Sequence, residues 1–424
     1  MTDDPGLCVQ RRTDGSTLIR TTSLLSDYAL RVTDRLLHWA AATPDATFLA
    51  ERAELGWRRL TYGQAATSMR RIAQGLLKRD LTIERPVLVL SGNGIDHALV
   101  GLACLHVGIP YVPISAAYSL ASNDTAKLRS IVALTTPGLI VAFGEAYGSA
   151  LDWAKSLNIE VLDNLEEMSS APTRAVDIAA ARVDGETVAK LLFTSGSTGA
   201  PKAVINTQRM LCSNQAMLAA RFEFLAEEPP VLLDWLPWSH TFGGNHNLNL
   251  VLFNGGTMFI DKGRPTPGGF DSTIEALHEI SPTLHLTVPL AWQALASHLR
   301  QDPVLNQKFF SRLRVPFFAA ASLPQPLWDE LERLSQEATG KSVPMITGLG
   351  CTETAPFALC TDGKSANAGS VGLPVTGIAL KLAPTHGKLE LRVRGPNVTP
   401  GYWRDATSTG AAFDEEGYYR MGDA

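Results

Sequence analysis

The stretch Leu191-Leu-Phe-Thr-Ser-Gly-Ser-Thr-Gly-Ala-Pro-Lys-Ala-Val204 decides the architecture of this chain. It begins as an apolar run, which is typical of a buried strand, and continues into a loop with two glycines, four hydroxyl side chains and one lysine. Such a loop can offer backbone N–H groups, hydroxyls and a cation to phosphate oxygens. The sequence therefore predicts a phosphate-binding loop after a strand, with Lys202 as its cation.

This loop differs from the common nucleotide-binding lysine loop. That motif needs the pattern G-x-x-x-x-G-K followed by Ser or Thr. Here Ala200 and Pro201 separate Gly199 from Lys202, and Ala203 follows the lysine. A Ser/Gly-rich surface turn is the simpler alternative, but the length and order of the stretch favour the phosphate-binding interpretation.

On both sides of this loop, short apolar runs alternate with helical periodicity, which indicates mostly parallel sheets with helices on their faces. After about Gly369 the pattern changes to short alternating segments separated by Gly and Pro. We therefore expect an α/β fold: two related subdomains with mostly parallel sheets and flanking helices, plus a small antiparallel β-barrel-like subdomain. The expected strands are 86–90, 138–142, 189–194, 231–236, 257–260, 284–288, 317–321 and 343–347, and the clearest helices are 62–77, 290–300 and 326–339.

Composition excludes several classes of protein. With 424 residues, a formal net charge of -5 and 45% hydrophobic residues, the chain is long enough for a large core and is not basic enough to suggest a nucleic-acid partner. The five cysteines are scattered without a C-x-x-C pair, which argues against a disulfide or zinc framework. No signal peptide or membrane span is evident, so we expect a cytoplasmic location.

Further blocks follow the loop in a characteristic order. Together with the loop they resemble the adenylate-forming superfamily, which includes acyl-CoA synthetases, luciferases and the adenylation domains of peptide synthetases. The resemblance covers nearly the whole chain. The blocks are Leu236-Pro-Trp-Ser-His-Thr-Phe-Gly-Gly244, Ala319-Ala-Ala-Ser-Leu-Pro324, Thr347-Gly-Leu-Gly-Cys-Thr-Glu-Thr-Ala-Pro356, Gly369-Ser-Val-Gly-Leu-Pro374, Arg394-Gly-Pro-Asn-Val-Thr-Pro-Gly-Tyr-Trp403 and Gly417-Tyr-Tyr-Arg-Met-Gly-Asp423.

The resemblance implies roles for individual residues. Catalysis would fall to Lys202, His240, Thr352 and Glu353, with Glu353 as the Mg²⁺ ligand and Asp423 on the ribose. A carboxylate beside a hydroxyl is also what a metal bridging protein and phosphate would need. Taken alone, the Thr352–Glu353 pair would be an ordinary solvated pair. The nucleotide-binding set is Thr194, Ser195, Gly196, Ser197, Thr198, Gly199, Lys202, Ala320, Ala321, Ser322, Thr347, Gly348, Leu349, Thr352 and Asp423.

The implied reaction joins a carboxylic acid to ATP, releases pyrophosphate and passes the acyl group from the adenylate to coenzyme A. The candidate acyl pocket is rich in aromatic residues, which favours a flat ring over a long alkyl chain, although these aromatics could simply be core. Segments 11–16, 33–39 and 238–246 look like the feruloyl-CoA synthetase branch, implying ferulate, p-coumarate or caffeate as the aromatic carboxylic acid. The pocket residues are Trp238, His240, Phe242, His246, Gly348, Pro356 and Phe357.

The resemblance also divides the chain. We expect an N-terminal α/β subdomain at 1–185, a second α/β subdomain with the phosphate loop and acyl pocket at 186–368, and a small β subdomain at 369–424. The family's C-terminal lid domain, with its catalytic lysine, is not in this sequence, so we expect both half-reactions to be impaired. Two alternatives stay open: an adenylating enzyme that passes its acyl group to a carrier protein, and a non-catalytic adenylate-binding domain.

Overall fold

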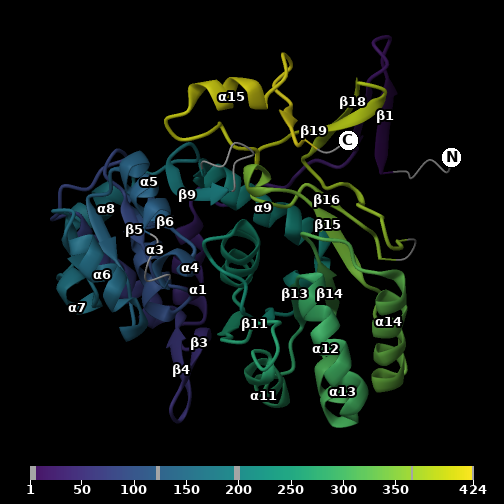
Figure 1. The fold of residues 1–424 in the computed structure, drawn as a ribbon, viewed down its shortest axis with the longest axis horizontal. Coiled ribbons are helices and arrows are strands. Elements are labelled where there is room, and N and C mark those ends of the chain that lie inside the picture. Colours follow the sequence, from purple (N-terminus) through teal and green to yellow (C-terminus); the bar gives the residue numbers. More distant parts are fainter. Residues whose placement is uncertain (1–5, 121–124, 195–200, 364–365, 423–424) are drawn as a thin grey trace.

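A computed structural model of the chain describes residues 6–120, 125–194, 201–363 and 366–422. Four sheets with flanking helices form the structure (Figure 1). Two parts of the expected nucleotide site, residues 195–199 and Asp423, lie outside the described residues.

The first sheet has six strands in the order β10-β9-β6-β5-β7-β8. Its strands pair in parallel except for the antiparallel pair β9 and β10, which flank the expected phosphate loop. The expected strands at 86–90, 138–142 and 189–194 are therefore confirmed within one or two residues. The strands are β5 (Val87–Val89), β6 (Tyr111–Pro113), β7 (Leu139–Val141), β8 (Glu160–Leu162), β9 (Val188–Thr194) and β10 (Lys202–Thr207).

Two further sheets form the second half of the molecule. One has the order β11-β12-β3-β4 and the other the order β13-β14-β15-β16-β17. The pairs β11–β12, β12–β3, β13–β14 and β14–β15 are parallel, and the pairs β3–β4, β15–β16 and β16–β17 are antiparallel, which matches the expected mostly parallel pattern. The strands are β3 (Thr47–Ala53), β4 (Gly56–Thr61), β11 (Val231–Asp234), β12 (Thr257–Ile260), β13 (Leu284–Thr287), β14 (Val315–Phe318), β15 (Ile346–Leu349), β16 (Leu359–Cys360) and β17 (Leu373–Pro374).

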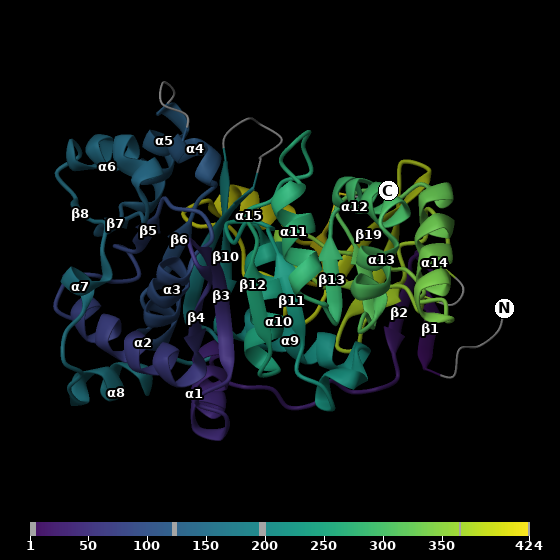
Figure 2. The same ribbon diagram turned by 90° about the horizontal axis from the view of Figure 1, so that it is seen from below.

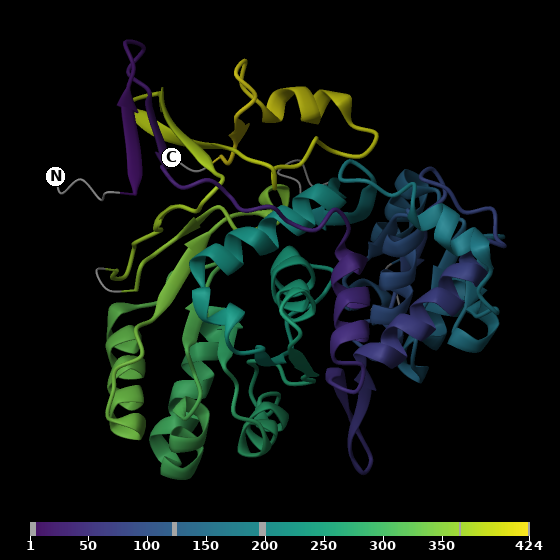
Figure 3. The same ribbon diagram turned by 180° about the vertical axis from the view of Figure 1, so that it is seen from behind.

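The fourth sheet joins the two ends of the chain. It is antiparallel throughout, with the order β1-β2-β18-β19-β20, so the described residues form an open sheet with two edges instead of a barrel. Figure 3 shows the N-terminal hairpin beside β18. Sheet membership thus crosses the subdomain boundaries expected from the sequence. The strands are β1 (Leu7–Arg11), β2 (Thr17–Thr21), β18 (Ala379–Thr385), β19 (Lys388–Arg394) and β20 (Tyr419–Arg420).

Helices cover the sheets, as amphipathic periodicity predicts. The helix α2 begins at a capping box in which Thr61 accepts from the N–H of Gln64, as the sequence predicts. Helices α12, α13 and α14 lie together beside β13 and β14 (Figure 2), and the indole of Trp292 on α12 donates to the Phe317 carbonyl oxygen at 3.1 Å.

The α-helices are α1 (Val32–Ala42), α2 (Tyr62–Leu76), α3 (Ile95–Val107), α4 (Ala116–Leu120), α5 (Ala126–Thr135), α6 (Gly148–Lys155), α7 (Leu165–Met168), α8 (Arg174–Ala180), α9 (Gln208–Arg221), α10 (Leu248–Phe253), α11 (Asp271–Glu279), α12 (Pro289–Gln301), α13 (Pro303–Phe310), α14 (Gln325–Thr339) and α15 (Ala406–Ala412). The described residues also form the 3-10 helices η1 (Glu145–Tyr147), η2 (Glu223–Ala226) and η4 (Thr352–Thr354), and the π-helix η3 (Phe242–Asn247). Among the described residues, no helix combines the length and apolar character needed to cross a bilayer.

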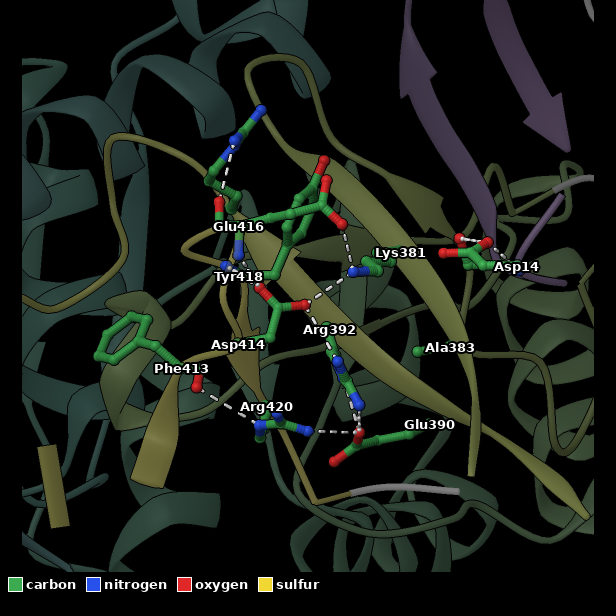
Figure 4. Close-up of polar contacts among 12 residues, drawn as sticks. Asp14, Lys381, Ala383, Glu390, Arg392, Phe413, Asp414, Glu416, Tyr418 and Arg420 are labelled. Atoms are coloured by element: carbon green, nitrogen blue, oxygen red, sulfur yellow. Dashed lines mark hydrogen bonds and ion pairs between the residues drawn. The ribbon is translucent and has the colours of Figure 1, made fainter. Parts of the chain in front are cut away.

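A buried carboxylate organises the fourth sheet. Asp414 accepts from Lys381 of β18 at 2.9 Å and from Arg392 of β19 at 3.0 Å, and its other oxygen accepts from the N–H groups of Glu416 and Tyr418 (Figure 4). Burial by itself would raise the pKa of Asp414, but these hydrogen bonds outweigh burial and lower the pKa to about 2. Asp414 therefore stays ionised and ties the turn before β20 to two strands.

We predict that Asp414→Asn lowers the local unfolding free energy of β19 by about 3 kcal/mol at pH 7, because two buried cations lose a charged partner. Amide hydrogen exchange of residues 388–394 measures this quantity. Since the folded pKa is lower than the unfolded value of 3.8, the stabilisation is present above about pH 4 and is lost as the pH falls towards 2.

The matched control is Asp152→Asn, because the Asp152–Lys155 pair is exposed. Its effect should stay within about 0.5 kcal/mol. Equal exchange rates in the two variants at pH 7 would contradict the role assigned to Asp414.

Candidate functional site

Of the expected site residues that the structure describes, most meet around one cavity of about 410 Å³. The cavity lies beyond the carboxyl ends of β9, β14 and β15, where open α/β sheets usually bind ligands. The π-helix η3 forms one wall, and β20 contributes Tyr419. The lining comprises Thr194, His240, Thr241, Phe242, His246, Phe317, Ala319, Ala320, Gly348, Leu349, Gly350, Cys351, Thr352, Glu353, Pro356, Phe357, Tyr419 and Met421.

Two glycines bring η3 against the preceding turn. A Cβ on Gly243 would lie 2.4 Å from the Leu236 carbonyl oxygen, and a Cβ on Gly244 would lie 2.3 Å from that of Trp238. Any larger residue would therefore push the helix away from the turn. This close approach places the two histidines of the segment on the cavity wall.

Aromatic rings form one part of this wall. The His246 ring stacks on Phe317, with 5.6 Å between centroids, and meets the edges or faces of Phe242 and Phe357 at 5.3 and 5.8 Å. A Cβ on Gly348 would come within 3.0 Å of the Phe317 ring, so this glycine leaves room beside it. The arrangement suits a planar apolar group, because aromatic faces and edges pack well against flat surfaces.

Thr352 and Glu353 lie on η4 at another part of the cavity. Both are buried, and Glu353 Oε1 accepts a hydrogen bond of 2.9 Å from the Tyr402 hydroxyl. The Glu353 carbonyl oxygen also accepts from the Thr399 N–H at 2.8 Å. The carboxylate is thus held by the 394–403 segment, in which the sequence pattern predicted no role for Tyr402.

Asn397 provides a second support from the same segment. Its side-chain amide donates to the carbonyl oxygens of Thr354 and Phe357 on either side of the turn after η4. Asn397 therefore holds the turn that leads from Glu353 to Phe357, both of which line the cavity. The Gly/Pro-rich pattern around Asn397 was the available sequence signal for a structured loop.

Lys202 does not line the same cavity as Glu353. It lines a neighbouring hollow of about 530 Å³, with Pro201, Trp403 and Asp405. Its ammonium lies 5.1 Å from the centroid of the Tyr402 ring. Tyr402 therefore contacts both charged residues, with its face near Lys202 and its hydroxyl on Glu353.

Four other expected site residues lie away from the cavity lining. Trp238 is buried against His97, with 5.4 Å between rings, because Asn93 bonds both Leu236 and Trp238 and turns the indole inward. Trp238 is therefore not among the residues that line the 410 Å³ cavity. Thr347 donates to the Phe318 carbonyl oxygen at 2.9 Å. The other two, Ala321 and Ser322, are exposed beyond β14.

The two cavity histidines are neutral at pH 7. Desolvation lowers the pKa of His240, and burial lowers the pKa of His246 to about 4. The Phe242 N–H donates to His240 Nδ1 at 3.3 Å, so the ring hydrogen of neutral His240 is on Nε2. Cys351 also lines the cavity, and burial raises the pKa of its thiol, which argues against a reactive thiolate.

The side chains of the site could bind Mg²⁺ only together with phosphate oxygens of a substrate. No group of three or more candidate metal-binding side chains exists in the described parts of the chain. Mg²⁺, however, is commonly held by one or two carboxylates together with substrate phosphates. Glu353 lines the cavity beside Thr352 and is held by Tyr402, so it has the chemistry for that arrangement.

Comparison with known proteins decides the family. The sequence model described as "AMP-binding enzyme" matches residues 36–403. The chain belongs to this family. The match includes the loop after β9, η3, η4 and Tyr402, and it agrees with the adenylate-forming resemblance.

Relatives of this AMP-binding enzyme include CoA ligases with different acids. It is 26% identical to the indoleacetate–CoA ligase of Aromatoleum aromaticum, covering 86% of this chain and 71% of the relative. It is also 26% identical to the feruloyl-CoA synthase of an Amycolatopsis species, covering 91% and 74%. The structure of apo MatB from Rhodopseudomonas palustris has the same fold, with a TM-score of 0.73 at 22% identity over 92% of this chain and 75% of that one.

We predict that Tyr402→Phe weakens Mg·ATP binding about fivefold, because Glu353 loses a hydrogen bond worth about 1 kcal/mol. Isothermal titration calorimetry measures the dissociation constant, and Tyr28→Phe is the control because the described residues show no hydrogen bond at that hydroxyl. If the dissociation constant of Mg·ATP were unchanged in Tyr402→Phe, a role in nucleotide binding for Glu353 as held by Tyr402 would be contradicted.

Proposed function

We propose that this AMP-binding enzyme activates an aromatic carboxylic acid with ATP and transfers the acyl group from the resulting adenylate to coenzyme A. Ferulate, p-coumarate or caffeate is the proposed acid. The observation that carries the proposal is the composition of the 410 Å³ cavity, which has an aromatic end at Phe242, Phe317 and Phe357 and a polar end at Thr352 and Glu353.

The chemistry follows from that polarity. A carboxylate oxygen of the acid forms a bond to the α-phosphorus of ATP while the bond to pyrophosphate breaks, and no base is needed because the acid is already ionised at neutral pH. The coenzyme A thiol then loses its proton to water and its sulfur bonds to the acyl carbon, while the bond from that carbon to the phosphate oxygen breaks and AMP leaves. Both steps depend on positioning and on compensation of oxygen charge.

The residues of the chain divide this work. Glu353 would hold Mg²⁺, which when bound offsets negative charge on phosphate oxygens. The Nε2–H of His240 can donate to the carboxylate of the acid, and the Thr352 hydroxyl can donate to a phosphate oxygen. Lys202 and the loop from Thr194 to Gly199 are the proposed partners of the remaining phosphate charge. The phenyl rings exclude water from the acyl end.

Two relatives support an aromatic acid, because one is named for indoleacetate and the other for ferulate. Indoleacetate and ferulate each have a flat aromatic ring system with a carboxylate on a short side chain. The chain matches about three quarters of the feruloyl-CoA synthase, and the expected impairment of the two half-reactions stays a prediction. Ligand binding is therefore the sharper test.

We predict that a non-hydrolysable feruloyl-adenylate mimic raises the thermal midpoint of the chain more than Mg·ATP or ferulate alone. The physical reason is that ligands binding only the folded state add about 2.7 kcal/mol at a hundredfold excess over their dissociation constant. An octanoyl-adenylate mimic should give a smaller shift, because an alkyl chain packs less well among the three phenyl rings.

Glu353→Gln should reduce the shift with Mg·ATP, while Glu337→Gln, on the exposed face of α14, serves as the matched control. Equal increases in thermal midpoint with the octanoyl and feruloyl mimics would contradict the proposal that the acid is aromatic. No shift with any adenylate mimic would remove the adenylation proposal itself.

A further inference from the structure

The helix α9 carries two buried amide side chains on consecutive residues, Asn214 and Gln215. Neither residue belongs to the lining of the 410 Å³ cavity. Each one instead bonds the backbone of a different segment that does line it. The two amides therefore connect one helix to two parts of the cavity wall.

Gln215 holds the π-helix η3. Its Nε2 donates to the carbonyl oxygen of Asn245 at 2.8 Å and to that of His246 at 3.3 Å. Backbone carbonyls can only accept, so the amide nitrogen of Gln215 must face them. A π-helix is rare and often occurs at a functional site, and η3 contributes the rings of Phe242 and His246 to the cavity wall. Gln215 thus fixes this wall relative to α9.

Asn214 holds the neighbouring wall at Phe357. Its Oδ1 accepts from the Phe357 N–H at 2.9 Å. The carbonyl oxygen of Phe357 in turn accepts from Asn397 at 2.9 Å. The backbone of Phe357 is therefore held on both sides, and one of the two partners lies on α9.

The two walls meet at the rings of His246 and Phe357, whose centroids are 5.8 Å apart with an angle of 68° between the ring planes. Adjacent residues of a single helix bond the backbones that carry these rings. The spacing of the rings is thus set by α9 before any acid binds. Such preorganisation favours binding, because the walls need not be ordered at the moment of association.

We infer that Asn214 and Gln215 are positioning residues that hold the two aromatic walls in the arrangement that selects a planar aromatic acid over a saturated ring acid of the same length. The inference rests on the proposed function and names residues that set its preference for the acid. Aromatic rings attract one another in offset or edge-to-face geometry at centroid distances of about 4.5 to 7 Å. A saturated ring is thicker and has no π face, so it gains less from these walls.

A purely structural role for the two amides predicts a different result. Their loss would then reduce the population of folded chain, which weakens the binding of every ligand by the same factor. That factor cancels in the ratio of the dissociation constants of two ligands. The ratio for two compounds with the same nucleotide part therefore reports on the walls and not on stability.

Two non-hydrolysable adenylate mimics provide this ratio: cinnamoyl and 3-cyclohexylacryloyl, which differ only in the ring. With the chain as it is, we expect calorimetry to show about fivefold tighter binding of the cinnamoyl compound. Equal binding of the two compounds would overturn the inference and leave the proposed adenylation intact. Absence of binding by both would overturn the proposed function.

Gln215→Met keeps the approximate size of the side chain and removes both hydrogen bonds to η3. We expect the preference for the cinnamoyl compound to fall to within about twofold, because two buried carbonyls lose their donor and the wall shifts. A fivefold preference that persists in Gln215→Met would overturn the inference.

The matched control is Gln208→Met on the same helix. Gln208 is also buried and donates to a backbone carbonyl oxygen, that of Leu105 on α3 at 3.1 Å, but it bonds neither cavity wall. This variant should lose stability and keep the preference of the unmodified chain. A preference that falls equally in Gln208→Met and Gln215→Met would contradict a specific role for Gln215.

Asn214 gives an independent pair of variants, so the test does not depend on the folding of one protein. Asn214→Leu removes the oxygen that accepts from Phe357 and should reduce the preference as Gln215→Met does. Asn214→Asp keeps an accepting oxygen and should retain the preference. Equal preferences in these two variants would overturn the role assigned to Asn214.

Discussion

The hydrogen bond from the Tyr402 hydroxyl to Glu353 is the contact on which the organisation of the site depends. It joins the 394–403 segment to η4, and the same segment bonds the backbone of β10 through Gly401 and Trp403. Glu353 is therefore held relative to both strands that flank the expected phosphate loop. A carboxylate on a free turn would have to be ordered each time a nucleotide bound, and that ordering would weaken binding.

From this fixed polar end the rest of the cavity follows in physical terms. The turn after η4 continues directly to Phe357, and Asn397 holds both parts. Gly243 and Gly244 let η3 pack closely against the preceding turn, and this packing places Phe242 and His246 on the cavity wall. A short path thus connects a site suited to phosphate and metal with a site suited to a flat ring, and an acid that spans the two places its carboxylate between them.

The sequence predicted most of the framework because the framework depends on local patterns. The apolar runs at 189–194 and 257–260 became β9 and β12, and the Thr61 capping box began α2. It could not predict that the hairpin at 7–21 would pair with β18, since that contact joins distant parts of the chain. For the same reason the packing of Trp238 against His97 was not predicted, and neither were the hydrogen bonds of Tyr402 and Asn397. Their function lies in long-range hydrogen bonds that no local pattern records.

The most direct test is a crystal structure of this chain with the non-hydrolysable feruloyl-adenylate mimic. The account predicts that the aromatic ring lies among Phe242, Phe317 and Phe357, and that the adenylate phosphate mimic lies beside Thr352 and Glu353. A ring bound outside this cavity, or a nucleotide in a hollow that Glu353 does not reach, would contradict the central claim that one cavity joins the acid site to the nucleotide site.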